Sequence, residues 1–307
     1  MRPRVVAFGG GTGLSASLRA LRLLDVDVCA VVTVADDGGS SGRLRSTRDL
    51  VPPGDLRKAM LALSDDTSMA RVFGHRFDGS DELSGHPVGN LVLAGLMETL
   101  DDPVEAVAVA SRFLGVRGTV LPMSTVPLDI EGDIDHSGRS STVRGQHNLG
   151  TSTGVVQHVR LKPDSPPACD QAVKAIGEAD WLVFGPGSWY TSVIPHLLVP
   201  RLREAIETAE GKKVVVLNLV NDSETDGLSL AEHLVALRAY ASGFTADVVV
   251  ADTHSTGEPE PVRRAAQSLG ARLLLASVAK PGSSGRHDCE ALAAALREVV
   301  ISVEVGK

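Results

Sequence analysis

The chain has 307 residues, of which 43% are hydrophobic and 22% are charged, as in a soluble globular protein with a large core. Its net charge of −8 and its aromatic content of only 3% disfavour binding to nucleic acid, which is itself anionic and is held by stacking on aromatic rings. No apolar run reaches the roughly 18 to 20 residues of a membrane helix, and the amino terminus lacks a signal-peptide pattern. We therefore expect a cytoplasmic protein with no membrane span and no nucleic-acid partner.

The first sixty residues predict a β-α-β unit. Residues 5–8 predict a buried strand, residues 14–24 an amphipathic helix and residues 28–34 a second apolar strand. A right-handed crossover makes the two strands parallel, so that their carboxyl ends share one edge of the sheet. Residues 35–54 then predict a long polar loop, and Asp55 is expected to cap a helix that continues to about residue 63.

The middle of the chain predicts a different architecture. Residues 66–115 favour helices, whereas residues 118–161 favour short strands. Four acidic residues in the latter stretch alternate with apolar ones, which indicates a half-exposed strand rather than a cation site: Asp129, Glu131, Asp133 and Asp135. We expect residues 55–162 to form an inserted helical and β layer.

After residue 163 the alternation of strands and helices resumes. The expected strands are 181–184, 214–219, 248–251 and 272–276, and the expected helices are 169–177, 192–209, 228–241, 259–269 and 288–299. Together with the first two strands, this pattern predicts an α/β fold with a doubly wound, Rossmann-like parallel sheet. We expect a single α/β domain over residues 1–307, with its core in residues 1–54 and 163–307.

A glycine-rich segment joins the first strand to the first helix. Such a junction lets the backbone approach a phosphate and directs the positive end of a helix toward it. The segment matches neither the phosphate-binding loop that ends in lysine nor the complete dinucleotide pattern, so a tight turn that only packs helix on strand remains an alternative. The binding residues that it predicts are Gly9, Gly10, Gly11, Thr12, Gly13 and Leu14.

An acidic pair followed by serines and an arginine begins where the second strand ends. Asp36 or Asp37 could contact a ribose or hold Mg²⁺, while Ser40, Ser41 and Arg43 could bind phosphate. A solvated acidic turn is the alternative. Residues 1–60 contain nine arginines and lysines against six aspartates, which suits a small anionic ligand.

Further polar residues follow predicted strands or open predicted helices. Asn90, near His86, lies at the start of an apolar helix, and Asn218 follows a strand. The segment 185–192 repeats the strand-glycine-helix arrangement, so two such loops predict one shared crevice. It contributes the candidate binding residues Gly185, Gly187, Ser188, Tyr190 and Thr191.

These segments resemble the bacterial gluconeogenesis-factor family, also described as UDP-sugar-binding morphogenesis factors, which share a fold with 2-phospho-L-lactate transferase. The resemblance spans nearly the whole chain and is most specific at residues 9–14, 35–45 and 52–57. Residues 85–86, 89–90, 185–192 and 286–288 match as well. The chain departs from the family pattern at Trp189 and at residues 219–225.

The resemblance implies a regulatory protein that binds UDP-glucose or UDP-N-acetylglucosamine and supports cell-wall synthesis and cell shape on gluconeogenic carbon sources. It would act on a protein partner, and we also expect a homo-oligomer. No cofactor is required, apart from Mg²⁺ that accompanies the nucleotide.

Two enzymatic alternatives stay open. The first is a Mg²⁺-dependent transferase of a phosphoryl-linked group, similar to 2-phospho-L-lactate transferase, with Asp36, Asp37 and Asp55 as candidate catalytic residues and Asp36 or Asp37 as the Mg²⁺ ligand. The second, an NAD(P)-dependent oxidoreductase, lacks an assignable acid–base pair for hydride chemistry.

Overall fold

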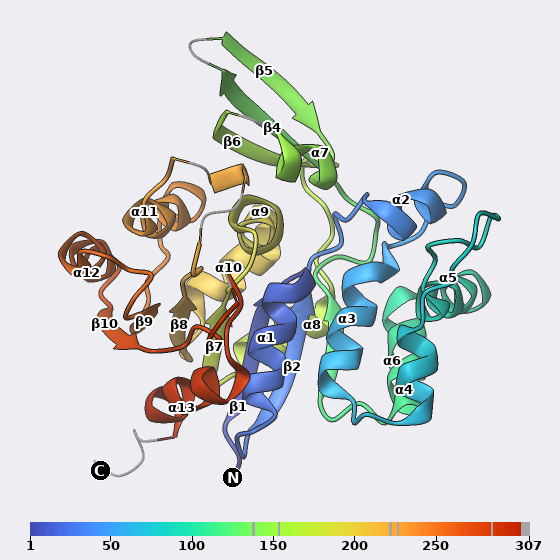
Figure 1. The fold of residues 1–307 in the computed structure, drawn as a ribbon, viewed down its shortest axis with the longest axis horizontal. Coiled ribbons are helices and arrows are strands. Elements are labelled where there is room, and N and C mark those ends of the chain that lie inside the picture. The colour runs from blue at the N-terminus through green and yellow to red at the C-terminus, as the bar shows by residue number, and fades with distance from the viewer. Residues whose placement is uncertain (137–138, 153, 221–222, 226, 284, 302–307) are drawn as a thin grey trace.

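A seven-stranded, all-parallel sheet forms the centre of the protein (Figure 1), whose computed structural model describes residues 1–136, 139–152, 154–220, 223–225, 227–283 and 285–301. The strand order is β10-β9-β8-β7-β1-β2-β3. The strands are β1 (Arg4–Gly9), β2 (Asp27–Val32), β3 (Thr119–Pro122), β7 (Trp181–Phe184), β8 (Lys212–Val216), β9 (Val248–Asp252) and β10 (Arg272–Ala276). All six strands expected from the sequence are present, which confirms the predicted α/β class and parallel sheet.

The strand order reverses between β1 and β7. From β1 the chain builds β2 and β3 on one side, and then returns to place β7, β8, β9 and β10 on the other. The loops that leave β1 and β7 therefore diverge at the carboxyl edge of the sheet. Ligands of doubly wound folds bind at such a reversal point.

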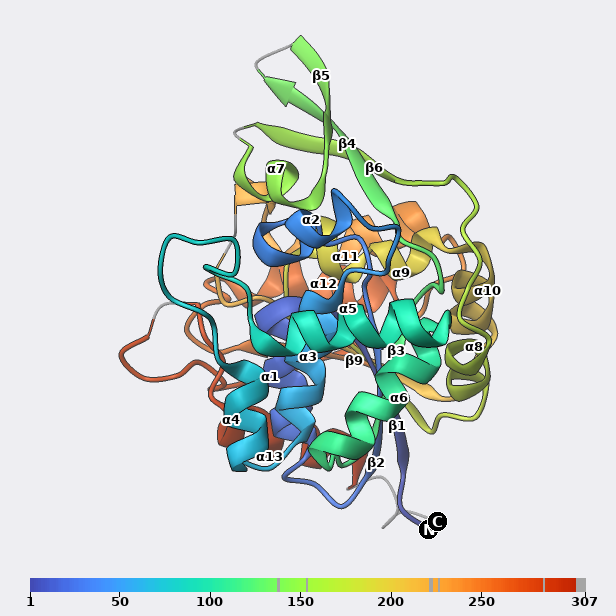
Figure 2. The ribbon, with the colours of Figure 1, turned by 90° about the vertical axis from the view of Figure 1, so that its right-hand side faces the viewer.

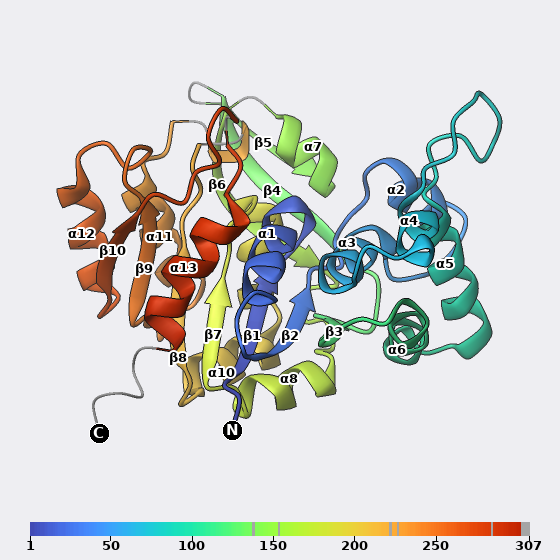
Figure 3. The same ribbon diagram turned by 60° about the horizontal axis from the view of Figure 1, so that its bottom comes forward.

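Helices cover both faces of this sheet (Figure 3). On one face α1 (Gly11–Leu21) packs between α3 (Pro53–Leu63) and α13 (Cys289–Val300), while α8 (Asp170–Gly177) and α10 (Pro200–Thr208) lie on the other. The remaining longer helices are α4 (Ser68–Gly74), α5 (Val88–Leu100), α6 (Pro103–Leu114), α11 (Leu230–Tyr240) and α12 (Pro259–Ser268).

Three local predictions need correction. The expected polar loop at 35–54 contains a helix, α2 (Gly39–Arg45), and α3 begins before Asp55, which therefore lies in its first turn instead of capping it. The helix expected at 192–209 is divided into η1 (Trp189–Val193), α9 (Pro195–Leu198) and α10. A proline stands at the start of both α9 and α10, where a missing N–H group is tolerated.

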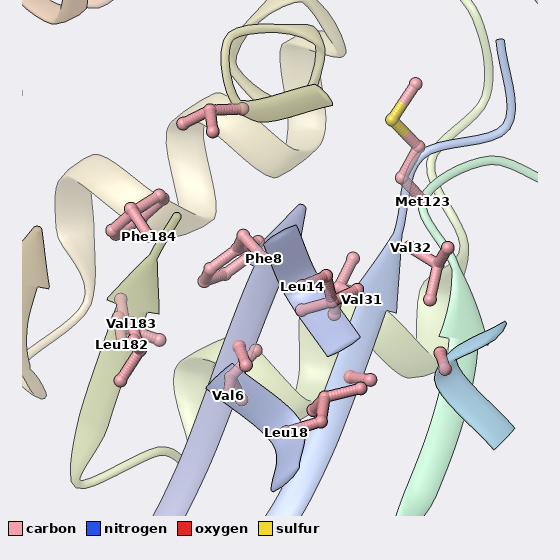
Figure 4. Packing of buried hydrophobic residues seen from close by; sticks show 14 of the residues in the cluster. Val6, Phe8, Leu14, Leu18, Val31, Val32, Met123, Leu182, Val183 and Phe184 are labelled. Carbon is pink, nitrogen blue, oxygen red and sulfur yellow. The ribbon is translucent and has the colours of Figure 1, made fainter. Parts of the chain in front are cut away.

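The core lies between the sheet and its helices (Figure 4). Phe8 of β1 and Phe184 of β7 stack with their ring centroids 4.6 Å apart. Leu14 and Leu18, one turn apart on α1, are buried against the strands. These contacts hold the starts of both glycine-rich loops in place.

A small antiparallel sheet, in the order β5-β4-β6, projects beyond the carboxyl edge of the large sheet, with α7 (Gln146–Thr151) beside it (Figures 1 and 2). Its strands are β4 (Asp129–His136), β5 (Arg139–Arg144) and β6 (Val155–Lys162). Apolar residues of β4 are buried, and Asp129, Glu131 and Asp133 pair with arginines, namely Arg45, Arg144 and Arg160. The predicted alternation is confirmed, and these carboxylates neutralise arginines.

One strand within the inserted layer expected at 55–162, β3, belongs to the large sheet. This strand pairs in parallel with β2 and forms the edge of the large sheet, as the pairing of Cys29 with Thr119 shows. A four-residue apolar run has the same local pattern whichever sheet it joins, so its place depends on contacts that are distant in sequence.

Candidate functional site

A cavity of about 970 Å³ opens where the loops after β1 and β7 meet. Its size lies in the range of natural small-molecule sites. Thr12 and Gly13 of the first loop line it together with Gly187 and Ser188 of the second. The crevice shared by two glycine-rich loops, expected from the sequence, is thus present in the structure.

The first loop leaves the start of α1 open. The helix has Gly10 as its N-cap, no side-chain cap and no acidic residue in its first turn. Its first intrahelical hydrogen bond is donated by Leu14 to the carbonyl oxygen of Gly10, at 3.2 Å, so the N–H groups of Gly11, Thr12 and Gly13 precede the helical ladder. Three N–H groups at the positive end of a helix can bind an anion.

Two glycines of this loop are required by close contacts. A Cβ on Gly10 would lie 2.5 Å from both Asp55 Oδ2 and Thr33 Cγ2. A Cβ on Gly13 would overlap the carbonyl oxygen of Pro186 and lie 2.5 Å from Gly187 Cα. Glycine therefore allows the two loops to touch. Gly9 and Leu14 complete the segment, and Leu14 is buried in the core.

Cations stand beside the open helix start. The ammonium of Lys58 is 3.9 Å from the position of a Cβ on Gly11 and 3.0 Å from Asp55 Oδ1. Arg57 is buried, and its Nε donates to Asn90 Oδ1 at 2.9 Å. Burial and then the nearby Arg76 lower the pKa of Arg57. Both Arg57 and Lys58 line the cavity.

The adjacent aspartates Asp36 and Asp37 face different partners. Asp36 Oδ1 accepts a hydrogen bond from Gly38 N at 3.0 Å, and burial followed by the charge of Asp55 raises the pKa of Asp36. Asp37 Oδ1 accepts from His147 N, at 2.9 Å, at the start of α7. Asp36 therefore shares its surroundings with Asp55, while Asp37 is turned toward the small sheet.

The polar residues of α2 and α5 bind one another. Ser40 Oγ lies 2.8 Å from His86 Nδ1 and accepts from Asn90 Nδ2 at 2.9 Å. Ser41 Oγ accepts from Gly54 N at 3.1 Å. Arg43 donates to the carbonyl oxygen of Ser84 at 2.7 Å. Among the described residues, none of Ser40, Ser41, Arg43 and Asn90 lines the cavity, so the geometry gives them a role in joining α2, α3 and α5.

Several main-chain groups of the second loop form hydrogen bonds with side chains of this same chain. Gly187 donates to Asn218 Oδ1 at 2.8 Å, and Asn218 Nδ2 donates back to the carbonyl oxygen of Gly187 at 2.9 Å. Glu224 Oε1 accepts from Tyr190 N at 3.0 Å and from Thr191 N at 3.4 Å. The anion-binding arrangement expected at Tyr190 and Thr191 is therefore occupied by a carboxylate of this chain.

The remaining parts of this loop support the cavity. Gly185, with a φ of 73°, has its carbonyl oxygen bound by Ser17 Oγ at 2.7 Å, which ties the loop to α1. Ser188 and Asn218 reach the cavity. Of the segment that departs from the family pattern, 219–225, residues 221 and 222 lie outside the described residues.

Sequence reasoning did not assign the far wall of the cavity. Lys280 and Arg286 line it, as does Arg19 of α1. Each is a single cation in a loop or on a helix surface, a pattern shared by many solvated side chains. Only the resemblance at residues 286–288 pointed to this region.

Comparison with known proteins shows the family to which this chain is similar. A model of the 2-phospho-L-lactate transferase CofD family matches residues 5–280. A protein of Mycobacterium tuberculosis is 50% identical over 310 residues, covering 96% of this chain and 90% of its own length. A relative from Bacillus subtilis named gluconeogenesis factor is 38% identical, covering 88% of this chain and 84% of its own length.

Solved structures agree with this relationship. The crystal structure of a UPF0052-family protein from Bacillus halodurans superimposes with a TM-score of 0.87 at 35% identity, covering 96% of this chain and 99% of that one. The chain belongs to the CofD family, and within it groups with relatives named gluconeogenesis factor.

Over the described residues, no helix has the length and apolar character needed to cross a bilayer. The same part of the chain holds no cluster of three or more His, Cys, Asp or Glu side chains arranged to hold a metal ion.

Proposed function

We propose that this protein binds a nucleoside diphosphate sugar, UDP-glucose or UDP-N-acetylglucosamine, and acts as a regulator rather than as a catalyst. The observation that most strongly supports this proposal is the uncapped start of α1 beside the ammonium of Lys58. Both lie at a cavity large enough for a nucleotide sugar. The diphosphate would accept hydrogen bonds from the N–H groups of Gly11, Thr12 and Gly13, and Lys58 would neutralise part of its charge.

The geometry assigns different roles to Lys58 and Arg43. Lys58 lies at the open helix start, whereas Arg43 is bound to Ser84 and is absent from the described cavity lining. A ligand in the cavity should therefore depend on Lys58 much more than on Arg43.

Calorimetric titration with both UDP-sugars tests this assignment. Because a charge-assisted hydrogen bond contributes about 1.5 to 3 kcal/mol, Lys58→Ala should weaken binding by about tenfold or more. Arg43→Ala is the matched control and should change the dissociation constant by less than about threefold. Saturable binding that is lost in Arg43→Ala and kept in Lys58→Ala would contradict the proposed site.

The regulatory role would be exerted by a homo-oligomer on a protein partner in cell-wall synthesis. Its test is complementation of a deletion strain that loses its normal shape on gluconeogenic carbon sources. The wild-type gene should restore cell shape, and the Lys58→Ala allele, expressed at the same level, should not.

A second candidate function is transfer of a phosphoryl-linked group. The observation that favours it is the buried carboxylate of Asp55 close to Asp36, whose pKa is raised by burial and by the charge of Asp55. Two such carboxylates fit a Mg²⁺ ion completed by phosphate oxygens. Mg²⁺ held by Asp36 and Asp55 would supply charge stabilisation on a leaving diphosphate.

Recovery of the ligand separates the two functions. A binder returns the UDP-sugar intact after long incubation with Mg²⁺, with or without a candidate acceptor. Consumption of the UDP-sugar by the wild type would favour the transferase, provided that the Asp55→Asn variant no longer consumes it.

A further inference from the structure

Three arginines gather beside the cavity, among the helices on the side of α1 away from α13 (Figure 3). Arg43 belongs to α2, Arg57 to α3, and Arg76 follows the end of α4. We call these three residues the arginine cluster. Within the described cavity lining, Arg57 is the one member of the cluster, so the cluster is a separate feature from the far wall of the cavity.

The two exposed members of the cluster are fixed on adjacent carbonyl groups. Arg43 Nη2 donates to the carbonyl oxygen of Ser84 at 2.7 Å, and Arg76 Nη1 donates to that of Gly85. Gly85 has a φ of 76°, and a Cβ on it would lie 3.3 Å from Arg43 Nη2. Because successive carbonyl oxygens hold them, the two guanidinium groups lie next to each other at the surface.

The third member is buried and is joined to the same loop by hydrogen bonds. Arg57 is only 7% exposed, and its Nε donates to Asn90 Oδ1 at 2.9 Å. Asn90 Nδ2 donates to Ser40 Oγ at 2.9 Å, and Ser40 Oγ lies 2.8 Å from His86 Nδ1. His86 directly follows Gly85, so this network connects the buried guanidinium with the two exposed ones.

The positive charges of the cluster act on one another. Burial and then the charge of Arg76 lower the pKa of Arg57. Burial, followed by the charges of Arg43 and Arg76, also lowers the pKa of His86. The fold therefore brings together cations that repel one another.

Over the part of the chain that the structure describes, none of the three arginines forms an ion pair, and the Nη groups of Arg57 have no hydrogen-bond acceptor. The charges of Asp55 and Asp36 raise the pKa of Arg57, but less than burial and Arg76 lower it. Asp55 is paired with Lys58 at 3.0 Å. A buried guanidinium without a paired anion is costly, so an anion bound at the cluster would stabilise it.

We propose that the arginine cluster binds the phosphate group of a second ligand, either inorganic phosphate or a phosphomonoester, at a site separate from that of the UDP-sugar. The planar guanidinium group matches the oxygens of phosphate, and three such groups can reach three oxygens of one tetrahedral anion. A carboxylate offers only two oxygens. Because Arg43 and Arg76 are exposed, the remainder of a monoester would extend into solvent.

Calorimetric titration with inorganic phosphate at constant ionic strength tests this site in the Lys58→Ala background. That background removes the cation with which phosphate could bind at the glycine loop, and it should keep saturable phosphate binding. Adding Arg76→Gln or Arg43→Gln should raise the dissociation constant by about tenfold or more, as expected for the loss of a charge-assisted hydrogen bond.

Arg71→Gln is the matched control, because it removes an exposed arginine of the adjacent α4 that lies 3.7 Å from Asp66. It should change the dissociation constant for phosphate by less than about threefold. Absence of saturable phosphate binding in the Lys58→Ala background would overturn the site. Equal affinities after Arg76→Gln and after Arg71→Gln would overturn it as well.

Two further probes identify the chemistry of the ligand. Glycerol 3-phosphate represents a phosphomonoester, and whichever of it and inorganic phosphate binds more tightly is the source of the phosphate group that the site favours. Acetate should bind at least about tenfold more weakly than both, and equal affinity for acetate would overturn the assignment to phosphate.

The outcome is independent of the proposed function. In the otherwise wild-type protein, Arg76→Gln should change the dissociation constants for the UDP-sugars by less than about threefold. If phosphate binds through the arginine cluster and neither UDP-sugar binds, the proposed function is wrong and the phosphate site stands.

Discussion

Gly13 is the point at which the two glycine loops touch, so it offers a test of their packing. Its replacement by alanine would place a Cβ against the backbone of Pro186 and Gly187, neither of which can rotate away. We expect Gly13→Ala to lower the free energy of unfolding by about 1 to 3 kcal/mol and to weaken nucleotide binding. Urea unfolding and calorimetry measure the two effects.

Gly95 provides the matched control for this substitution. It lies in the middle of α5, and a Cβ there would meet no atom within 4 Å. Gly95→Ala should therefore stabilise the protein by about 0.5 to 1 kcal/mol, because alanine is the better helix former. Equal effects of the two substitutions would show that the loops are not in tight contact.

The candidate site could be predicted only in part at the residue scale. The glycine loop was recognisable because a strand, a glycine run and a helix follow one another in the chain. The divergence of Asp36 and Asp37 was not, since the partners Gly38 and His147 lie at very different sequence distances. Adjacent carboxylates in a loop carry no local pattern that reveals their orientation.

At the element scale, the segment between β9 and α13 depends on one buried carboxylate. Burial alone would raise the pKa of Asp252, but hydrogen bonds from four main-chain N–H groups outweigh it and lower that pKa. The donors are His254, Ser255, Val278 and Ala279. The loop after β9 and the hairpin that carries Lys280 and Arg286 are therefore joined through this side chain.

Asp252→Asn should loosen that hairpin. The amide nitrogen of asparagine would face main-chain donors, so we expect a loss of about 1 to 3 kcal/mol in the free energy of unfolding. Hydrogen exchange at Val278 and Ala279 should accelerate. Asp164→Asn, at an exposed pair with Lys162, is the control and should change stability by less than about 0.5 kcal/mol. Unchanged exchange at Val278 in Asp252→Asn would contradict this role.

Elements with strong periodicity could be predicted, and weakly patterned ones could not. The six strands that the sequence predicted for the large sheet are apolar runs between helices, and all six are present in the structure. The helix α2 was missed because glycine and serine dominate its seven residues, and its stability comes from contacts such as Ser40 with His86 and Arg45 with Asp129. Tertiary contacts override local propensity there.

For the whole molecule, a buried histidine makes stability depend on pH. His196 is fully buried, with its ring nitrogens 3.0 Å from Val31 O and 3.2 Å from Val193 O. Burial lowers its pKa to about 4, although these carbonyl oxygens oppose the shift. Below the pKa of about 6.5 that a histidine has in the unfolded chain, this residue binds a proton in the unfolded state but stays neutral in the native state.

Stability should consequently fall as the pH is lowered from about 6.5 toward 4. We expect this histidine to account for a loss of about 2 kcal/mol between pH 7 and pH 5. His196→Gln should be less stable than the wild type at pH 7, because it disturbs the core, but should show a shallower loss on acidification. Urea unfolding at both pH values measures this difference, and parallel losses in the two proteins would contradict it.

The fold and the site are connected through the strand order. Reversal between β1 and β7 separates two loops, and α3 and the hairpin before α13 then bring cations to the opening from both sides. A parallel sheet is visible in the sequence, but the cations converge from positions 19, 57, 58, 280 and 286. Only the folded chain brings these positions together.

Hydrogen exchange in the presence of UDP-N-acetylglucosamine tests whether a nucleoside diphosphate binds at the start of α1. We predict protection of the main-chain N–H groups of residues 11–13, together with slower exchange in the hairpin that follows Val278. Protection confined to α2 and the start of α5, around Arg43 and Asn90, would contradict this binding mode and place the ligand outside the cavity.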